Sequence, residues 1–425
     1  MLMALMLPVS VEYNITESVM VNLPTEPMLG IAILSICWDI INKKNYVEHL
    51  FTRETLWILP LIGSFIIASF FSEIHTVSVK YSIINCGYIL VFFIWLKHFF
   101  KVYKGLFVKL MLLYSLSLIV VLVYATINFI DFDMNPITIK GVFKPFYRDH
   151  TILGATSGIL SMFWLSFSIK MGKSSLKLLS FLLGILFFLT VIFSHSRAAF
   201  LSLLFSGMVG CVLVFKIQPR YLILGVLILS ISVVAFWKSI YSVLILNTKL
   251  SHTETYAFVD QIQSSANITS DISNIERLNR WLSGIAMFVE KPITGFGPGT
   301  FQFEYIPFQK EHLKNRLSVT DPWHIPGNSG GTAHSEYILV LSEMGLLGFV
   351  SLLILMGRWG WIIFFKNSSP VHRPIIIIAG ISLSSYFFHA FFNNFLNTDK
   401  FAFLFWGIAA WMVGNFETKK PDAVS

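Results

Sequence analysis

The sequence predicts an all-α integral membrane protein with many transmembrane helices and one large loop outside the membrane. Of its 425 residues, 55% are hydrophobic and only 13% are charged, and the mean hydropathy is +0.71. A water-soluble domain does not bury so large an apolar fraction, whereas about 20 apolar residues in a helix cross ~30 Å of hydrocarbon. Because many segments approach that length, we expect a polytopic protein.

Eleven apolar segments are long enough, or nearly so, to be transmembrane helices. They are expected at residues 28–42, 55–72, 79–97, 106–129, 151–169, 178–194, 197–215, 221–240, 336–357, 374–393 and 400–416. Residues 1–10 are also apolar but lack a basic leader and a cleavage site, so we expect a clipped or short first helix rather than a signal peptide. The total is eleven or twelve helices.

The chain is predicted to have three parts. These are an N-terminal transmembrane bundle at 1–240, a large periplasmic loop at 241–335, and C-terminal transmembrane helices with a short cytoplasmic tail at 336–425. Lys and Arg number 17 in one alternating set of loops and six in the short loops opposite. Basic residues are retained on the cytoplasmic side, so the C-terminus is expected in the cytoplasm and the large loop outside the inner membrane.

Charge and cysteine usage exclude several functions. The net charge of +8 follows from the basic cytoplasmic loops, and residues 241–335 hold seven Lys or Arg against eight Asp or Glu, so no nucleic-acid partner is expected. All three cysteines lie within apolar spans, which favours packing over a disulfide or thiolate zinc site. The histidines of the large loop lack the spacing of a helical metal pair. We therefore predict no metal and no cofactor.

Within the large loop, residues 276–291 are predicted to form an amphipathic helix with one face buried against protein or the membrane interface. Arg277 and Arg280 are three positions apart and project from neighbouring positions. Two guanidinium groups so placed could bind a diphosphate. Alternatively, Arg280 pairs with Glu276 on a solvated face, and the sequence leaves both interpretations open.

Two other external turns carry charge. Arg197 lies in a turn that joins two spans with almost no loop, so it is either fixed as an anion ligand at a helix start or extended towards lipid headgroups. Arg148, Asp149 and His150 lie at the mouth of the span that begins near residue 151. Asp149 is expected to act mainly as a helix N-cap, and Arg148 and His150 are possible lining residues of a site.

A glycine-rich polar loop leads through His334 and Glu336 into the ninth span. An imidazole at a water boundary, with a pKa near ~6.5, suits a general base, although such a histidine is often a hydrogen-bonded structural group. Glu336 could orient the imidazole or cap the helix. Glu343 lies deeper, where an ionisable group is usually paired or functional.

Together these motifs carry a family resemblance. In order along the chain they are Ser196-Arg197-Ala198, Arg277 with Arg280, Pro292–Phe301, His334-Ser-Glu-Tyr and Glu343-Met-Gly345. The set resembles the O-antigen ligase and O-antigen polymerase superfamily. Residues 276–281, 305–309 and 330–336 are similar to a subgroup associated with Bacteroidetes and usually labelled O-antigen ligase.

The resemblance implies a GT-C-type membrane glycosyltransferase that takes a glycan from undecaprenyl diphosphate in the periplasm. A ligase delivers the glycan to lipid A-core, whereas a polymerase uses a second lipid-linked glycan. We expect a ligase first, a polymerase second and a non-enzymatic polysaccharide transporter third. By the same resemblance, Arg197, Arg277 and Arg280 bind the diphosphate, and His334 deprotonates the acceptor with assistance from Glu336. The guanidinium groups then supply the positive charge without a metal.

Overall fold

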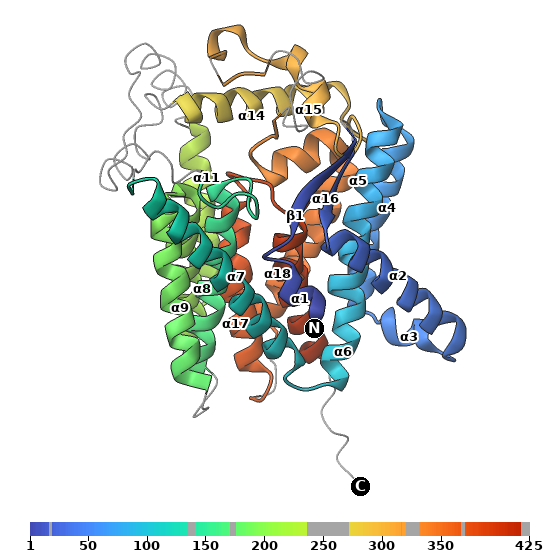
Figure 1. The fold of residues 1–425 in the computed structure, drawn as a ribbon. Coiled ribbons are helices and arrows are strands. Elements are labelled where there is room, and N and C mark those ends of the chain that lie inside the picture. Colours follow the sequence, from blue (N-terminus) through green and yellow to red (C-terminus); the bar gives the residue numbers. More distant parts are fainter. Residues whose placement is uncertain are drawn as a thin grey trace.

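The computed structural model describes most of the chain as a bundle of helices with shorter elements lying across one end, which we call the loop end (Figure 1). The described residues are 1–16, 19–134, 141–170, 176–235, 272–315, 317–319, 331–366 and 370–417. The first part of the predicted large loop, residues 241–271, and the glycine-rich residues 327–330 lie outside this set.

Helices follow all eleven segments predicted to span the membrane. They are α2 (Thr25–Asn42), α4 (Leu59–Phe70), α5 (His75–Tyr88) with its continuations η2 (Ile89–Trp95) and α6 (Leu96–Val102), α7 (Leu106–Asp131), α8 (His150–Lys170), α9 (Leu176–Phe193), α10 (Arg197–Val214), α11 (Pro219–Ala235), α16 (Glu336–Phe364), α17 (Arg373–His389) and α18 (Asp399–Glu417). Within the described residues, six helical stretches are long and apolar enough to cross a membrane. The predicted all-α membrane class is confirmed, although fewer helices meet both criteria than the eleven or twelve expected.

The N-terminal segment differs from a transmembrane helix. Residues 1–10 contain α1 (Leu2–Met6), whose five residues span only about 8 Å at 1.5 Å per residue. A hairpin that the sequence did not predict follows, made of antiparallel strands β1 (Val11–Thr16) and β2 (Val19–Leu23). Ser10 is fully buried, and its hydroxyl donates to Asp399 at 3.0 Å. The segment is thus fastened to the start of α18.

Small residues allow α8, α10 and α17 to pack closely. A Cβ at Gly154 of α8 would lie 2.8 Å from the Ser194 hydroxyl and from Cβ of Ser196, just before α10. Ser202 of α10 lies 3.3 Å from Ser385 of α17, hydroxyl to hydroxyl. Small and hydroxyl-bearing side chains are typical of close contacts between membrane helices. These contacts fix the loop-end termini of the three helices relative to one another.

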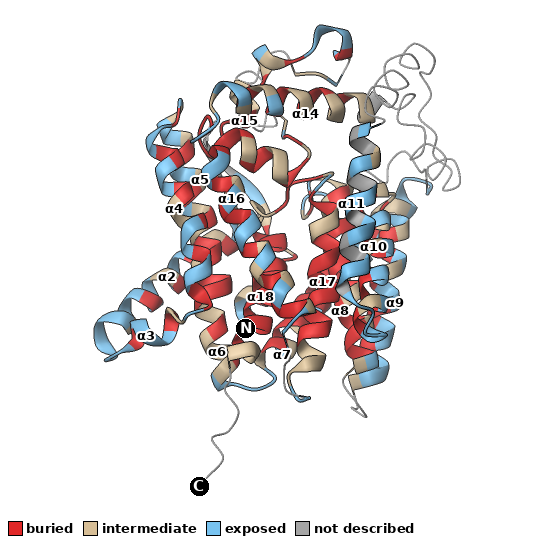
Figure 2. Ribbon diagram, turned by 180° about the vertical axis from the view of Figure 1, so that it is seen from behind, coloured by how far each residue is buried: buried red, intermediate tan, exposed pale blue. Residues whose placement is uncertain are grey.

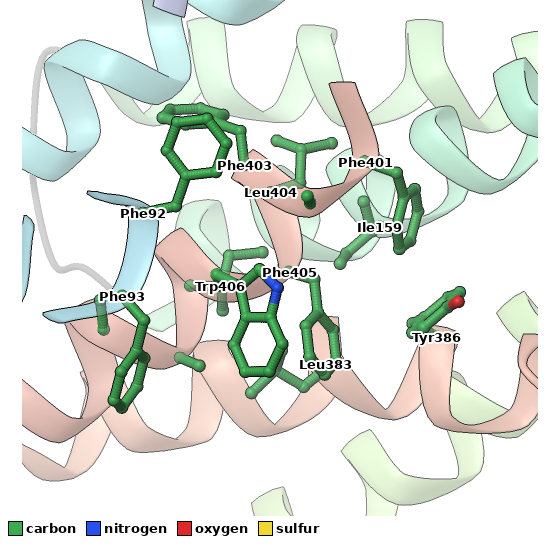
Figure 3. Packing of buried hydrophobic residues seen from close by; sticks show 14 of the residues in the cluster. Phe92, Phe93, Ile159, Leu383, Tyr386, Phe401, Phe403, Leu404, Phe405 and Trp406 are labelled. Carbon is green, nitrogen blue, oxygen red and sulfur yellow. The ribbon is translucent and has the colours of Figure 1, made fainter. Parts of the chain in front are cut away.

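An aromatic core surrounds α18 (Figure 3). Phe403 packs edge-on against Phe92 with ring centroids 5.5 Å apart, and Trp406 lies 6.2 Å from Phe93. Nearly every residue of α18 is buried, whereas the outer helices expose many apolar side chains (Figure 2). Packed aromatic side chains therefore fill the centre of the bundle, and the surfaces of the outer helices suit a lipid environment.

Ion pairs occupy the end of the bundle opposite the loop end. Arg358 of α16 donates from Nε to Glu54 at 2.8 Å, and its Nη2 bonds to the other oxygen of the same carboxylate. Lys101 pairs with Glu417 at the end of α18. Several basic residues that fix the predicted orientation are thus also structural ion-pair partners.

Candidate active site

The helix α14 (Ile272–Glu290) lies across the loop end (Figure 1). Much of the side that packs against protein is polar, with Glu276 and Ser283 buried, whereas Ile285 and Val289 are 45% and 70% exposed. The helix is therefore present as predicted, but its apolar side chains are not all buried against protein. The membrane interface is the remaining predicted partner for Ile285 and Val289.

Below α14, the helix α16 is interrupted at Gly345, where φ is 58° and ψ is −155°. The segment after α14 supplies backbone partners at the interruption. The amide of Leu346 donates to the carbonyl of Pro292 at 2.8 Å, and the amide of Gly297 donates to the carbonyl of Glu343 at 2.8 Å. A Cβ at Gly345 would lie 2.4 Å from a backbone oxygen of that segment, which explains the glycine. Non-helical backbone within a membrane helix is tolerated where protein groups satisfy it in this way.

Glu343 secures the same segment with its side chain. Its carboxylate is 3% exposed and accepts a hydrogen bond from the amide of Phe301 at 2.9 Å, at the start of the short helix α15 (Phe301–Glu304). Glu343 was expected to be either paired or functional, and its hydrogen bond with the amide of Phe301 indicates that it is paired. Glu343 positions the segment that supports α14 and is not directed at His334 by any contact among the described residues.

Arg280 of α14 is buried and contacts three residues. Its side chain is 7% exposed, and Nε donates to Glu276 at 2.8 Å, so the pair proposed from the i,i+4 spacing exists but is buried rather than solvated. Its Nη1 donates to the carbonyl of Thr332 at 3.2 Å and lies 3.4 Å from Nε2 of His334. A Cβ at Gly331, whose φ is +93°, would lie 2.4 Å from the same Nη1. The guanidinium therefore joins α14 to the residues before α16.

His334 lies directly before α16 with φ of 49°, a conformation uncommon for residues other than glycine. Its carbonyl accepts from Nε1 of Trp281 at 3.2 Å, and its amide donates to the hydroxyl of Thr332 at 3.3 Å. These contacts hold the backbone of His334 in a strained region, an arrangement often found at functional sites. They direct the imidazole towards Arg280.

Burial, followed by the charges of Arg280 and Arg277, lowers the pKa of His334 to about 3. A hydrogen-bonding interaction with Asn393 and the charge of Asp149 act in the opposite direction. These contributions show that Arg277, Arg280, His334 and Asp149, four of the residues singled out in the sequence, share one electrostatic environment. At neutral pH the imidazole is uncharged and can accept a proton.

The last residue of α17 and the turn that follows it add two residues that the sequence did not predict. His389 and Asn393 are 1% and 3% exposed, and Nδ2 of Asn393 lies 3.0 Å from Nε2 of His389. A histidine near the end of an otherwise apolar span is the signal that could have identified this region, because ionisable groups at such depth are usually functional or paired. The segment 389–393 faces His334.

Glu336 does not orient the imidazole through any contact among the described residues. Its carboxylate accepts from the hydroxyl of Tyr386 at 2.5 Å and from the amide of Leu396 at 3.4 Å. Its own amide donates to the carbonyl of Ala390 at 2.8 Å. Glu336 thus clamps the start of α16 to the end of α17, and Ser335, whose hydroxyl accepts from the amide of Ile338, is the N-cap.

In the turn before α8, Arg148 and Asp149 have different structural roles. Arg148 pairs with Glu12 of strand β1, which ties the N-terminal hairpin to this turn. Asp149 accepts from the amide of Thr151 at 3.0 Å, as expected of an N-cap, and lies 2.6 Å from Nδ1 of His150. Burial opposes ionisation, but hydrogen bonds from His150 and Thr151 hold the pKa of Asp149 well below its usual range. Asp149 therefore carries a negative charge near His334.

Arg197 is the first residue of α10 and follows the N-cap Ser196, whose hydroxyl accepts from the amide of Ala199 at 3.4 Å. Ser202 and Ser206 of α10 contact Ser385 and Ile381 of α17, so the two helices run antiparallel and the start of α10 lies at the same end of the bundle as His389. Among the described residues, no group of three or more His, Cys, Asp or Glu side chains could hold a metal ion.

Chemically, the loop end combines an uncharged imidazole with two guanidinium groups in one partly buried region. Such an arrangement can bind an anion and accept a proton beside it. A mostly apolar cavity lies next to it between α4, α5 and α16, and its lining includes Phe65, Leu339 and Met344 together with Glu336 and Glu343.

Residues 179–353 match a family model, Wzy_C, described as O-antigen ligase. The matched range includes α9, α10, α14 and the first part of α16, and therefore Arg197, Arg277, Arg280 and His334. Members of the Wzy_C family are glycosyltransferase-like enzymes. No curated protein matches the chain. The Wzy_C match at residues 179–353 therefore supports the O-antigen ligase and polymerase superfamily that the motifs predicted.

Proposed function

We propose that the protein is an O-antigen ligase that transfers a glycan from undecaprenyl diphosphate to lipid A-core at the periplasmic face of the inner membrane. The Wzy_C domain supports ligase-type or polymerase-type activity in general. The observation that supports glycan transfer from a lipid diphosphate, the step that a ligase and a polymerase share, is the contact between Arg280 and His334, because it puts an anion-binding group beside a proton acceptor.

A lipid diphosphate suits this site for two reasons. The periplasm offers no nucleotide sugars, so the donor must carry its own leaving group. Guanidinium groups bind phosphate through paired N–H donors and are especially effective where water is excluded. Arg277 and Arg280 on α14, together with Arg197 at the start of α10, would bind the two phosphates.

The proposed reaction is a single inverting displacement. The acceptor hydroxyl oxygen forms a bond to the anomeric carbon of the donor while the bond from that carbon to the diphosphate oxygen breaks. The hydroxyl proton goes to His334, and the electron pair of the broken bond leaves with the lipid diphosphate. The guanidinium groups stabilise the negative charge that develops on this leaving group. No redox partner is needed.

The protonation state of His334 agrees with this role. Without substrate, burial and the neighbouring arginines lower its pKa to about 3, so the imidazole is available as a base. A bound diphosphate would compensate the charges of Arg277 and Arg280 and thereby raise the pKa of His334 towards neutrality. The base would become more effective when the donor is present.

Deletion of the gene tests the function. If the protein is a ligase, the mutant loses all core-attached glycan while long chains remain on the lipid carrier. If it is a polymerase, the mutant keeps core that bears a single repeat unit. Unchanged surface glycan would reject both enzyme assignments and leave the transporter to be tested.

The proposed orientation has a separate test. Single cysteines introduced at exposed positions of α14 and at the end of α18, in a chain without its three native cysteines, are expected to react from opposite sides of the membrane. A membrane-impermeant maleimide applied to intact spheroplasts should label α14 and leave the end of α18 unlabelled. Labelling of the α18 end alone would reverse the assignment.

A further inference from the structure

We propose that Asn393 is a positioning residue that holds the imidazole of His334 in the orientation and tautomer required of a base, with His389 fixing the amide of Asn393 on its other side. This inference rests on the proposed function, because it takes His334 as the base. It adds a residue from the turn after α17, outside the part of the chain that matches Wzy_C.

Backbone contacts first bring the two segments together. The amide of Glu336 donates to the carbonyl of Ala390 at 2.8 Å, and the hydroxyl of Ser335 donates to the same carbonyl at 3.3 Å. Thus the two residues that follow His334 are joined to the turn between His389 and Asn393. This connection does not depend on any titratable group of the site.

Trp281 of α14 provides a second connection. Its indole Nε1 donates to the carbonyl of His334 at 3.2 Å, and its ring lies 6.4 Å from the ring of Phe392, centroid to centroid. Phe392 immediately precedes Asn393. The indole therefore touches both segments, and α14, α16 and α17 meet around the imidazole.

Hydrogen-bond chemistry assigns the proton positions. The amide nitrogen of Asn393 can only donate, so Nε2 of His389, 3.0 Å away, must accept, and the ring proton of neutral His389 is on Nδ1. The carbonyl oxygen of the same amide is then available to accept from His334. Because Arg280 can only donate, Nε2 of His334 is its acceptor and the proton of neutral His334 is on Nδ1.

One consistent arrangement follows. The imidazole of His334 has its lone pair on the side of Arg280, where the diphosphate would bind, and its N–H is available to the carbonyl oxygen of Asn393. An amide or carboxylate that fixes the tautomer of a catalytic histidine is a recurrent device in nucleophilic enzymes. Here both faces of the asparagine amide have a histidine partner.

The charges around His334 set the expected pH behaviour. Arg277 and Arg280 of α14 disfavour its protonated form, Asp149 before α8 favours it, and neutral His389 of α17 faces it across Asn393. The interaction with Asn393 also favours the protonated form. Removing the amide should lower the proton affinity of His334, whereas a carboxylate in its place should raise it.

The experiment measures transfer by the full-length protein in lipid nanodiscs, with a polyprenyl-diphosphate-linked glycan as donor and lipid A-core as acceptor, as a function of pH. Asn393→Ala is expected to lower kcat about 10- to 100-fold while KM for the donor changes less than about twofold. Asn393→Asp, which keeps size and an acceptor oxygen, should retain more activity and move the acidic limb of the kcat profile to higher pH.

Asn394→Ala is the matched control, because Asn394 is the neighbouring buried asparagine at 6% exposure. It should leave the position of the acidic limb unchanged. If Asn393→Ala matches the wild type while His334→Ala is inactive, the inference on Asn393 is wrong and the base assignment stands. If Asn393→Asp lowers kcat without moving the limb, Asn393 is only structural and the inference is likewise overturned. Full activity of His334→Ala would reject both the assignment of His334 as the base and the positioning role of Asn393.

Discussion

Arg358, in the last two turns of α16, and Arg280 of α14, which contacts the residues just before α16, show how the same side chain can serve stability or binding. Arg358 directs both Nε and Nη2 at the single carboxylate of Glu54, and its guanidinium lies 4.4 Å from the ring of Trp361 and 5.6 Å from that of Trp57. Arg280 gives only Nε to Glu276, while its Nη1 faces a carbonyl and an imidazole. The guanidinium of Arg358 is thus neutralised by one bidentate carboxylate, whereas the guanidinium of Arg280 divides its hydrogen bonds among a carboxylate, a carbonyl and an imidazole.

The difference has a physical consequence. A guanidinium that is neutralised by a bidentate carboxylate gains little from another anion, because binding would require breaking an existing pair. Arg280 interacts with neutral groups through Nη1, and these are weaker partners than a phosphate oxygen. The comparison therefore predicts that substitution of Arg280 mainly affects catalysis and substitution of Arg358 mainly affects stability. Substitution of His334 should reduce catalysis more than substitution of either arginine.

The largest expected effect is that of His334→Ala. Loss of the proposed base should reduce transfer about 10²- to 10⁴-fold without preventing membrane insertion, because the ring contributes little to the apolar core. Activity is measured with purified protein at equal concentration. His312→Ala, at an exposed histidine of the same large loop, should retain wild-type activity. Transfer by His334→Ala at the wild-type rate would exclude this residue as the base.

Arg280→Lys should have the next largest effect. Lysine keeps the charge but cannot reach Glu276, Thr332 and His334 at once, so the diphosphate and the imidazole would lose their relative placement. We expect kcat/KM for the donor to fall roughly 10- to 100-fold, with a small change in thermal midpoint. A variant with normal kcat/KM would show that the three contacts of the Arg280 guanidinium have no function in transfer.

Arg358→Lys should show the opposite pattern. Loss of the bidentate pair and of the aromatic stacking is expected to lower the free energy of unfolding by about 1–3 kcal/mol. The thermal midpoint in detergent measures this effect, and transfer per folded molecule should remain normal. If Arg358→Lys instead impairs transfer without loss of stability, the two ends of α16 are coupled and the comparison fails.

The sequence predicts the helices well and the contacts between them less well. Each expected span coincides with a helix over most of its described residues, because apolar runs of this length leave the backbone no other way to satisfy its hydrogen bonds in lipid. The hairpin formed by Val11–Thr16 and Val19–Leu23 was not predicted. The burial of Ser10 against Asp399 depends on residues 389 positions apart, which no local pattern reveals.

The same limit applies to the site. The i,i+4 spacing correctly suggested the pair between Glu276 and Arg280. The burial of this pair, however, follows from the contacts of Arg280 with Thr332 and His334, which lie more than 50 positions away in the sequence. Glu336 was expected to assist His334 because it is two residues away, yet successive residues at a helix start point in different directions. Its carboxylate faces Tyr386 instead. The partner of each of these side chains is therefore determined by tertiary packing and not by spacing in the sequence.

The smallest expected effect concerns stability and pH. The folded-state pKa of His334 is depressed to about 3, whereas an unfolded histidine titrates near ~6.5. Protons therefore bind preferentially to the unfolded chain between these values, so the contribution of neutral His334 is complete above about pH 6.5 and is lost as the pH falls towards 3. Because the ring is partly exposed, we expect a total loss of at most about 1 kcal/mol between pH 7 and pH 4.

The thermal midpoint measured from pH 7 to pH 4 tests this contribution. The decrease should be smaller in His334→Gln than in the wild type, and His312→Gln should behave as the wild type. Pyrophosphate should also reduce the decrease, because an anion beside Arg277 and Arg280 compensates the charges that disfavour protonated His334. An unchanged pH dependence in His334→Gln would mean that the arginines of α14 do not control this histidine, and the contrast between Arg280 and Arg358 would then rest on geometry alone.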